Sequence, residues 1–300
     1  MVARVRRFNR LVTQRVGALD DRFLARGRPL GEARLLWEIG PEGCELRRLR
    51  ERLDLDSGYL SRLLRNLEED GLVTVGPAER DRRLRTARLT ASGRRERALL
   101  DRRSDELAES VLDPLGGAQR ERLVAAMADV ERLLTAAMVS IEPLDPEHPH
   151  GRHCLREFPA ELDRRFPQGF DPALSISAEA DELRPPAGLL LVASLGPEPV
   201  GCGALKFHDD GPTELKRMWI AESARGLGLG RRLLGELEAH AARGPSPVVR
   251  LETNESLAEA IALYRSAGYA EVEPFNDEPY AHHWFEKRLE LAQGTSPAAR

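Results

Sequence analysis

The stretch Arg225-Gly226-Leu227-Gly228-Leu229-Gly230-Arg231 decides the fold of the second half of this 300-residue chain. It joins a strand-like run, Leu215 to Ile220, to an amphipathic segment, Arg231 to Arg243. Glycines permit positive φ and let a ligand approach the main chain closely, while consecutive amides can form a concavity that binds an anion. The positive end of the helix dipole adds to this attraction. The sequence therefore predicts a pyrophosphate site at residues 226–231.

Two other glycine-rich phosphate loops fit this stretch poorly. A P-loop ends in Lys-Ser or Lys-Thr, and the stretch has neither. A dinucleotide-binding loop is followed about 20 residues later by an acid that binds the ribose, and none is evident here. On spacing alone, a purely structural turn is an equal alternative.

The segments around the loop follow a recognisable order. Val248 to Thr253 reads as another strand, and Leu257 to Ala267 reads as a helix. Arg225-x-x-Gly228-x-Gly230 resembles the Arg/Gln-x-x-Gly-x-Gly/Ala signature of the GNAT superfamily of N-acetyltransferases, and Leu263 to Tyr269 resembles its Leu-Tyr-x-x-x-Gly-aromatic element. The resemblance covers about residues 150–290 and implies an α/β fold with a mixed, splayed central sheet.

The resemblance also implies a cosubstrate and a mechanism. Acetyl-CoA would enter the gap between the two strands, with its pyrophosphate on the loop amides and its pantetheine arm held by the main chain of the first strand. A neutral amine then attacks directly, so neither a metal nor a covalent enzyme intermediate is required. The cofactor-binding residues expected from the resemblance are Met218, Trp219, Ile220, Arg225, Gly226, Leu227, Gly228, Leu229, Gly230, Arg231 and Asn254.

Two residues are candidates for proton transfer. The phenol of Tyr264 could hydrogen-bond the departing thiolate, whose thiol titrates near ~8.5, and the resemblance favours this role over that of a packed aromatic. Glu214, at the start of the central strand, could accept the amine proton directly or through water; an ordinary solvated Glu is an equal alternative. Leu257 stands where many family members carry Asn. Asn254 then either binds the cofactor in its place or only caps the helix.

The first half of the chain carries a helix-turn-helix pattern. Apolar residues recur at helical spacing between Phe8 and Phe23, and again in two short faces on either side of Asp54-Leu55-Asp56. Asp56 is the expected N-cap of the second helix, and Gly71 its C′ residue. The outward side of that helix could reach DNA phosphates or base edges, although a solvated polar face is the alternative. The side chains in question are Ser57, Ser61, Arg62, Arg65 and Asn66.

A β-hairpin with an arginine-rich tip is predicted directly after this helix. Leu72 to Val75 and Leu84 to Thr90 read as its strands, and such a tip suits a narrow minor groove. The motifs from Leu55 to Gly93 resemble the MarR family of transcriptional regulators, and the match covers about residues 5–140. This resemblance implies a mainly α winged helix-turn-helix that binds double-stranded DNA. Arg80, Arg82 and Arg83 would lie at the tip, with Asp81 bracing an arginine.

The resemblance further implies a homodimer, because the terminal helices of MarR-like proteins intertwine. An apolar stripe recurs at helical spacing from Leu123 to Met138, and one small domain could hardly bury it alone. A monomeric helical bundle is the alternative.

Length and charge suit two domains with separate tasks. Residues 1–140 carry 28 basic and 23 acidic side chains, whereas the remainder carries 17 and 26. The expected organisation is a winged-helix domain at 1–141, a proline-rich linker at 142–152, an acetyltransferase domain at 153–291 and a flexible tail at 292–300. His148, His150 and His153 do not complete a metal site and read as solvated linker residues.

The remaining features bound the cellular setting. Cys44, Cys154 and Cys202 are scattered and odd in number, which indicates a reducing cytoplasm. No apolar run is long enough to cross a bilayer, so no membrane partner is expected. The leading interpretation is a cytoplasmic homodimer that binds duplex DNA and acetylates an amine of unidentified structure. Two alternatives stay open: a regulator that only senses acetyl-CoA, and an acetyltransferase whose winged helix serves only dimerisation or protein docking.

Overall fold

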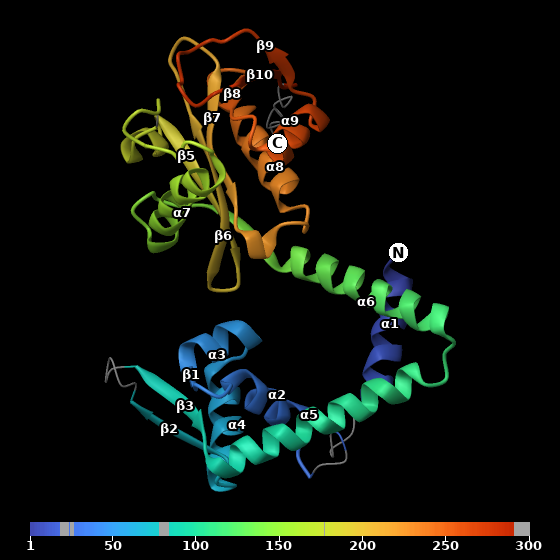
Figure 1. The fold of residues 1–300 in the computed structure, drawn as a ribbon. Helices are drawn as coiled ribbons and strands as arrows, with labels where there is room; N and C mark the ends of the chain where they lie inside the picture. The colour runs from blue at the N-terminus through green and yellow to red at the C-terminus, as the bar shows by residue number, and fades with distance from the viewer. Residues whose placement is uncertain (19–23, 25–26, 78–83, 177, 291–300) are drawn as a thin grey trace, which may run out of the picture. The chain divides into compact units, whose positions relative to one another are not determined.

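The computed structural model describes residues 1–18, 24, 27–77, 84–176 and 178–290. The chain divides into two compact units, Met1–Ala128 and Asp129–Arg300, each with its own core (Figure 1). Among the described residues, no helix has the length and apolar character needed to cross a membrane.

The N-terminal unit is mainly helical and carries a small antiparallel sheet. Its strands β1 (Cys44–Glu45), β2 (Val73–Pro77) and β3 (Arg85–Leu89) lie in the order β1-β3-β2. This is the predicted winged helix-turn-helix. The helices are α1 (Val2–Arg15), α2 (Leu30–Ile39), α3 (Leu46–Leu53), α4 (Ser57–Glu69), α5 (Ala91–Leu112) and α6 (Gly117–Met138), the last of which continues into the C-terminal unit.

Local chemistry explains where α4 begins and ends. The Asp56 carboxylate accepts a hydrogen bond from the Tyr59 amide at 2.8 Å, which satisfies one free N–H of the first turn. At the other end Gly71 has φ of 67° and follows the C-cap residue Asp70, so a left-handed residue stops the helix. Both predicted caps of α4 are confirmed.

The start of α5 explains the Leu89-Thr90-x-x-Gly93 motif. Thr90 caps α5 by accepting a hydrogen bond from the Gly93 amide at 3.0 Å. A Cβ on Gly93 would lie 2.0 Å from the Leu72 carbonyl oxygen, so only glycine fits beside β2. The motif therefore fixes how α5 leaves the hairpin.

The C-terminal unit is built on a seven-stranded mixed sheet in the order β4-β5-β6-β7-β8-β10-β9. Its strands are antiparallel except for the central β7–β8 pair, which is parallel. The strands are β4 (Val139–Pro143), β5 (Gly188–Leu195), β6 (Glu198–Lys206), β7 (Thr213–Ile220), β8 (Val248–Thr253), β9 (Ala270–Val272) and β10 (His283–Arg288).

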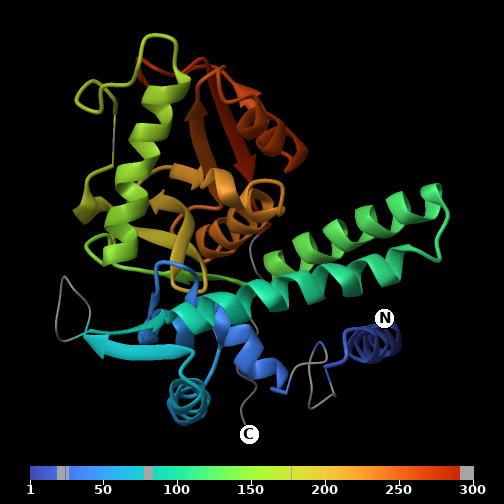
Figure 2. The ribbon, with the colours of Figure 1, turned by 60° about the horizontal axis from the view of Figure 1, so that its bottom comes forward.

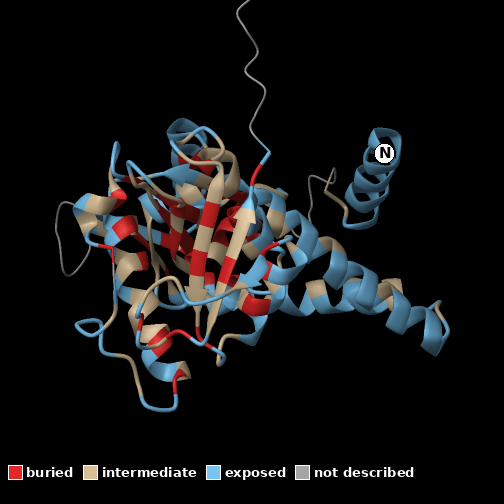
Figure 3. Ribbon diagram, turned by 90° about the horizontal axis from the view of Figure 1, so that it is seen from above, coloured by how far each residue is buried: buried red, intermediate tan, exposed pale blue. Residues whose placement is uncertain are grey.

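Helices cover both faces of this sheet (Figures 1 and 2). Because side chains alternate along a strand, β6 sends Cys202 and Ala204 into a core with α7 (Pro149–Arg165) and Leu205 into a core on the other face. That second core is completed by α8 (Leu229–Ala241) and α9 (Ala258–Ser266). The buried residues accordingly gather in the strands of the sheet (Figure 3).

Residues 142–152 differ from the predicted linker. Glu142 and Pro143 end strand β4, which pairs with β5, and α7 already begins at Pro149. Proline is tolerated at the end of an edge strand and is favoured at the first helical position, so its abundance here marks element boundaries. His148 is the N-cap of α7 and accepts a hydrogen bond from the His150 amide at 3.2 Å.

Two helices keep large apolar side chains exposed. None of the residues of α1 is buried, and Phe8 and Leu11 lie on its surface. Along α6, Met127, Leu134 and Met138 are more than half exposed. These are members of the apolar stripes that the sequence predicts for a dimer interface.

Candidate functional sites

Strands β7 and β8 separate after two residue pairs. Thr213 pairs with Val249 and Glu214 with Arg250, and within the described residues the pairing ends there. The register of β7 against β6 also shifts next to Arg217, which has φ of 58°. An extra residue of this kind bends a strand and increases its twist. Beyond the bulge the main chain of β7 therefore faces a gap, as the predicted splayed sheet requires.

The loop after β7 presents its peptide N–H groups outward. Gly226 and Gly228 have φ of 79° and 73°, and α8 begins directly after Gly228. In the described part of the chain, no protein acceptor is found for the N–H groups from Gly226 to Arg231. Gly230 is helical; a Cβ there would lie 3.4 Å from Leu263 of α9. Two glycines thus shape the loop through their left-handed conformation, whereas a Cβ at the third would make only ordinary van der Waals contact with α9.

The side chains of the loop turn away from these amides. Leu229 is buried, and Leu227 packs against the same apolar cluster. Arg225 donates to the Ile220 carbonyl at 3.2 Å and pairs with Glu161 of α7. Burial alone would raise the pKa of Glu161, but hydrogen bonds from Arg225 and Arg164 outweigh it and lower that pKa. Arg225 therefore braces the loop against α7.

A cavity lies beside the separated strands. Tyr264 of α9 lines it together with Met218 of β7 and Asn254, which follows β8. Tyr264 is only 4% exposed, and burial followed by the charge of Glu252 raises its pKa far above the ordinary value. The phenol is therefore held neutral beside the cavity. The aromatic lining residues are Phe158, Phe166, Phe170, Tyr264 and Tyr280.

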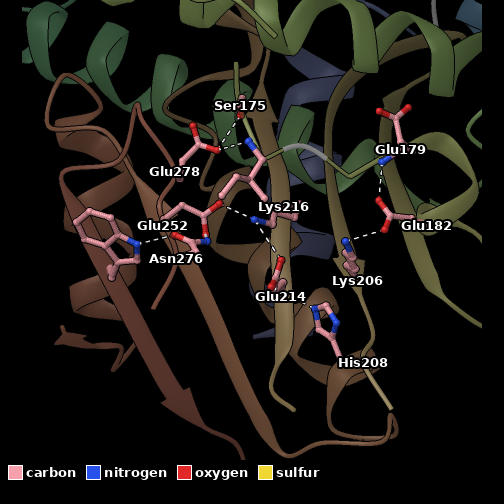
Figure 4. Close-up of polar contacts among 12 residues, drawn as sticks. Ser175, Glu179, Glu182, Lys206, His208, Glu214, Lys216, Glu252, Asn276 and Glu278 are labelled. Carbon is pink, nitrogen blue, oxygen red and sulfur yellow. Dashed lines mark hydrogen bonds and ion pairs between the residues drawn. The ribbon is translucent and has the colours of Figure 1, made fainter. Parts of the chain in front are cut away.

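A charged network reaches from this cavity to the connection between β6 and β7 (Figure 4). Lys216 Nζ lies 2.5 Å from Glu252 and 3.2 Å from Glu214, which in turn lies 3.2 Å from His208. Burial alone would lower the pKa of Lys216, but the two carboxylates raise it. Lys216 is therefore a cation held between two anions. Asn276 donates to the same Glu252 carboxylate at 3.4 Å.

In the N-terminal unit, the side chains of α4 that were predicted to face DNA are exposed to solvent. Ser57, Ser61, Arg62 and Arg65 are exposed, and the Arg62 guanidinium lies 5.6 Å from the Tyr59 ring centre. Asn66 is exposed as well, but its amide donates to the buried Glu32 at 2.9 Å. That contact ties α4 to α2. Arg80, Arg82, Arg83 and Asp81 lie outside the described residues.

Comparison with known proteins decides the family of the C-terminal unit. A family model described as the acetyltransferase (GNAT) family matches residues 155–269. An IAA acetyltransferase of Azospirillum brasilense is 36% identical over 121 residues, which cover 40% of this chain and 78% of the relative. An uncharacterised N-acetyltransferase of Schizosaccharomyces pombe is 31% identical over 153 residues, which cover 46% of this chain and 93% of the relative. The chain belongs to the GNAT acetyltransferase family.

The family relation extends to a second module. A model described as the MarR family matches residues 26–84. Among solved structures, a GNAT-family acetyltransferase from Staphylococcus aureus is 17% identical with a TM-score of 0.44 and covers 51% of this chain and 99% of its own. The two family models show a MarR-type module followed by a GNAT N-acetyltransferase domain, as both resemblances predicted.

Within the GNAT domain, the predicted cofactor residues fall into two groups. In one group, Gly226 to Arg231 run from the loop into the first turn of α8, where no protein acceptor is found for their amides in the described residues, and Arg231 also donates to Ser266 of α9. Met218 lines the cavity. Trp219 and Ile220 send their side chains into apolar clusters, so only their main chain remains available for a ligand.

Glu214 lies apart from Tyr264. It does not line the cavity that Tyr264 lines among the described residues, and it is held by Lys216 and His208. The physical reason is its place on β7, at the last point where β7 and β8 are still paired. The carboxylate of this network that does line the cavity is that of Glu252, on strand β8.

Both ends of the Asn254 side-chain amide are engaged within the protein. Its amide donates to the Tyr280 carbonyl at 2.7 Å, and its oxygen accepts from the Ser256 amide at 2.8 Å. Helix α9 instead begins after Leu257, which offers no capping side chain. The helix-cap alternative for Asn254 is therefore wrong; the residue ties the end of β8 to the 273–282 segment.

Sequence reasoning missed three charged residues that line the cavity: Lys216, Glu252 and Glu278. The first two stand on the facing strands β7 and β8, where alternation of polar side chains along each strand is a usable signal. Glu278 lies between strands β9 and β10 and comes to the cavity through tertiary folding alone. No local pattern marks it.

Proposed function

We propose that this protein is a bifunctional transcriptional regulator and acetyl-CoA-dependent N-acetyltransferase. The observation that carries the transferase half is the row of unbonded peptide N–H groups from Gly226 to Arg231 at the start of α8. Such a row suits a diphosphate, and the exposed main chain of β7 beside it suits the amide-bearing arm of coenzyme A. Acetyl-CoA bound there supplies the acetyl group as a thioester.

The residues of the cavity then divide the proton transfers. Tyr264 is neutral and donates its proton to the departing thiolate. Glu252 takes the proton of the amine, because it lines the cavity. The sequence suggested Glu214 for this role. Lys216 holds the two carboxylates in place. The amine attacks directly, so orientation of the two substrates carries much of the rate.

The transferase half is tested by measuring coenzyme A release with a panel of amines. We expect saturable turnover with at least one amine, together with direct binding of coenzyme A. Binding of coenzyme A without turnover of any amine would count against catalysis.

We propose that α4 and the wing bind duplex DNA. The support is the exposed row of Ser57, Ser61, Arg62 and Arg65 on one helix. Phosphate contacts by arginine make affinity fall steeply with salt. Arg62→Ala and Arg65→Ala should weaken binding and lower the salt dependence, whereas Asn66→Ala should act on folding stability through Glu32. DNA affinity and salt dependence that are unchanged in both arginine variants would instead indicate that the winged helix serves only dimerisation or protein docking.

We propose that the protein is a homodimer through the exposed apolar faces of α1 and α6. Phe8, Leu11, Met127, Leu134 and Met138 supply these faces. We place the DNA-binding and dimerisation part before β4 and the transferase part from β4 to residue 290. Sedimentation analysis should show a dimer, and Leu134→Glu should yield monomers.

A second candidate function is acetyl-CoA sensing without turnover. Arg132, on the part of α6 that belongs to the C-terminal unit, donates to the Gly226 carbonyl at 3.3 Å. The proposed diphosphate loop is thus in contact with the helix that follows the winged-helix module. A sensor requires that DNA and coenzyme A change each other's affinity by the same factor.

A further inference from the structure

One wall of the cavity is an aromatic cluster. Phe166, Phe170 and Tyr280 have ring centres 4.8 to 5.9 Å apart, and all three line the cavity. The Tyr280 hydroxyl accepts a hydrogen bond from the Asp171 amide at 2.9 Å, which holds the ring in place. Aromatic clusters of this spacing favour a further ring in an edge or offset arrangement. This wall therefore offers a site for a flat apolar body.

Glu278 stands beside this cluster as a buried carboxylate without a cation. It is 8% exposed and accepts hydrogen bonds from Ser175 Oγ at 2.9 Å and from the Ile176 amide at 2.6 Å. The Tyr280 amide donates to its other oxygen at 3.3 Å. All of these donors are neutral. No cationic side chain lies within ion-pair distance of Glu278 in the described ranges of the chain, although buried carboxylates are usually paired.

The nearby cations are already engaged. Lys216 lies between Glu252 and Glu214, so the charge of this triad is itself negative. Arg217 lies 5.5 Å from the Phe158 ring centre and donates to the Ala178 carbonyl at 3.3 Å. Of the two carboxylates that line the cavity, only Glu252 is therefore paired with a cation within the described residues, and Glu278 stands next to the aromatic faces with neutral donors alone. A carboxylate combined with ring faces is the composition that binds an organic ammonium.

We infer that the acetyl acceptor is a small primary amine that carries an aromatic ring, bound as its ammonium by Glu278 with its ring on Phe166, Phe170 and Tyr280. This inference rests on the proposed transferase function. Two strands, two helices and three loops surround the cavity, which suits a small molecule better than an extended peptide.

The bound ammonium must lose a proton before it reacts. Glu252 takes this proton, and the neutral nitrogen forms a bond to the acetyl carbon while the carbon–sulfur bond breaks. The thiolate takes a proton from Tyr264, and the second proton released by the nitrogen restores the phenol. Amine ammonium and thioester thus become amide, thiol and one proton.

Equilibrium binding to the coenzyme A-loaded protein tests the recognition separately from turnover. The probes are 2-phenylethylamine, 2-cyclohexylethylamine, phenylalanine and 2-phenylethanol, and we expect the first to bind most tightly. Glu278→Gln should weaken 2-phenylethylamine about tenfold or more, in line with the loss of a charged hydrogen bond, and leave 2-phenylethanol unchanged. Glu273→Gln, at an exposed position in the same segment, is the matched control.

A second variant guards against misfolding of Glu278→Gln. Phe170→Leu keeps the apolar volume and should reduce the preference for phenyl over cyclohexyl, with coenzyme A affinity unchanged as the check on folding. Equal affinity for 2-phenylethanol and 2-phenylethylamine would overturn the inference, as would tighter binding of phenylalanine. Turnover of other amines but not of 2-phenylethylamine would also overturn it while leaving the transferase intact. Tight binding of 2-phenylethylamine without turnover of any amine would instead remove the transferase and keep the binding site.

Discussion

At the scale of single residues, Tyr264 is the group whose removal should be most informative. Its phenol is buried, neutral and next to the cavity, which are the properties of a proton donor. Tyr264→Phe should lower kcat by about 10²- to 10⁴-fold with little change in KM for coenzyme A substrates. Tyr269→Phe is the matched control, because Tyr269 is equally buried and packs edge-to-face against Tyr264, with ring centres 5.8 Å apart, but lies outside the cavity lining. A similar loss of kcat in both variants would assign the effect to packing.

The same burial should appear in the dependence of stability on pH. The folded-state pKa of Tyr264 is raised above the ordinary ~10, so the unfolded chain ionises first as pH rises. The contribution of the neutral phenol is complete below about pH 10 and is lost as pH rises through the folded-state pKa. Urea unfolding at a series of alkaline pH values should therefore show a steeper fall in unfolding free energy for the wild type than for Tyr264→Phe. Parallel curves would contradict the burial of the phenol.

At the scale of elements, the proposed diphosphate loop requires glycine at position 228 for its backbone conformation and not for lack of room for a side chain. A Cβ on Gly228 would meet nothing within 4 Å, yet φ is 73°. Gly228→Ala should therefore cost about 1–2 kcal/mol through the left-handed conformation and weaken coenzyme A binding. Gly235→Ala, inside the same helix and also in open space, should stabilise the protein by about 1 kcal/mol. Urea unfolding measures the change in stability of each variant, and coenzyme A titration measures the change in affinity. We expect the two changes in stability to have opposite signs.

The same elements show how far the sequence predicts this fold. The glycine loop, the caps of α4 and the separated β7–β8 pair follow from local chemistry and from two family motifs, and the structure agrees with them. The sequence of residues 142–152 suggested a linker, whereas the structure has the end of β4 and the start of α7 there. The frequency of proline and histidine does not distinguish these two cases. The hydrogen bonds of Glu278 with Ile176 and of Asn66 with Glu32 could not be predicted, because these partners lie 102 and 34 residues away in the chain.

At the scale of the whole molecule, α6 belongs to both units of the chain. It runs from Gly117 to Met138 and leads directly into β4, without an intervening residue. Its last turns contact the GNAT domain through Arg132, which donates to the Gly226 carbonyl, and through the Ala136 carbonyl, which accepts from Arg232 at 3.2 Å. The loop that we propose for the diphosphate is therefore fixed partly by this helix.

This connection predicts linkage between the two ligands. Because coenzyme A on the loop and DNA on α4 both act on a chain that shares α6, each should change the affinity for the other by one common factor, of about 5- to 150-fold where such coupling exists. Titration of coenzyme A with and without a duplex that the protein binds measures that factor. Arg132→Ala should bring the coupling factor towards one, while DNA and coenzyme A each still bind when the other is absent. Arg122→Ala, an exposed arginine of the same helix, should leave it unchanged. Identical coenzyme A affinity with and without DNA in the wild-type protein would separate the two activities and leave α6 as a simple connection.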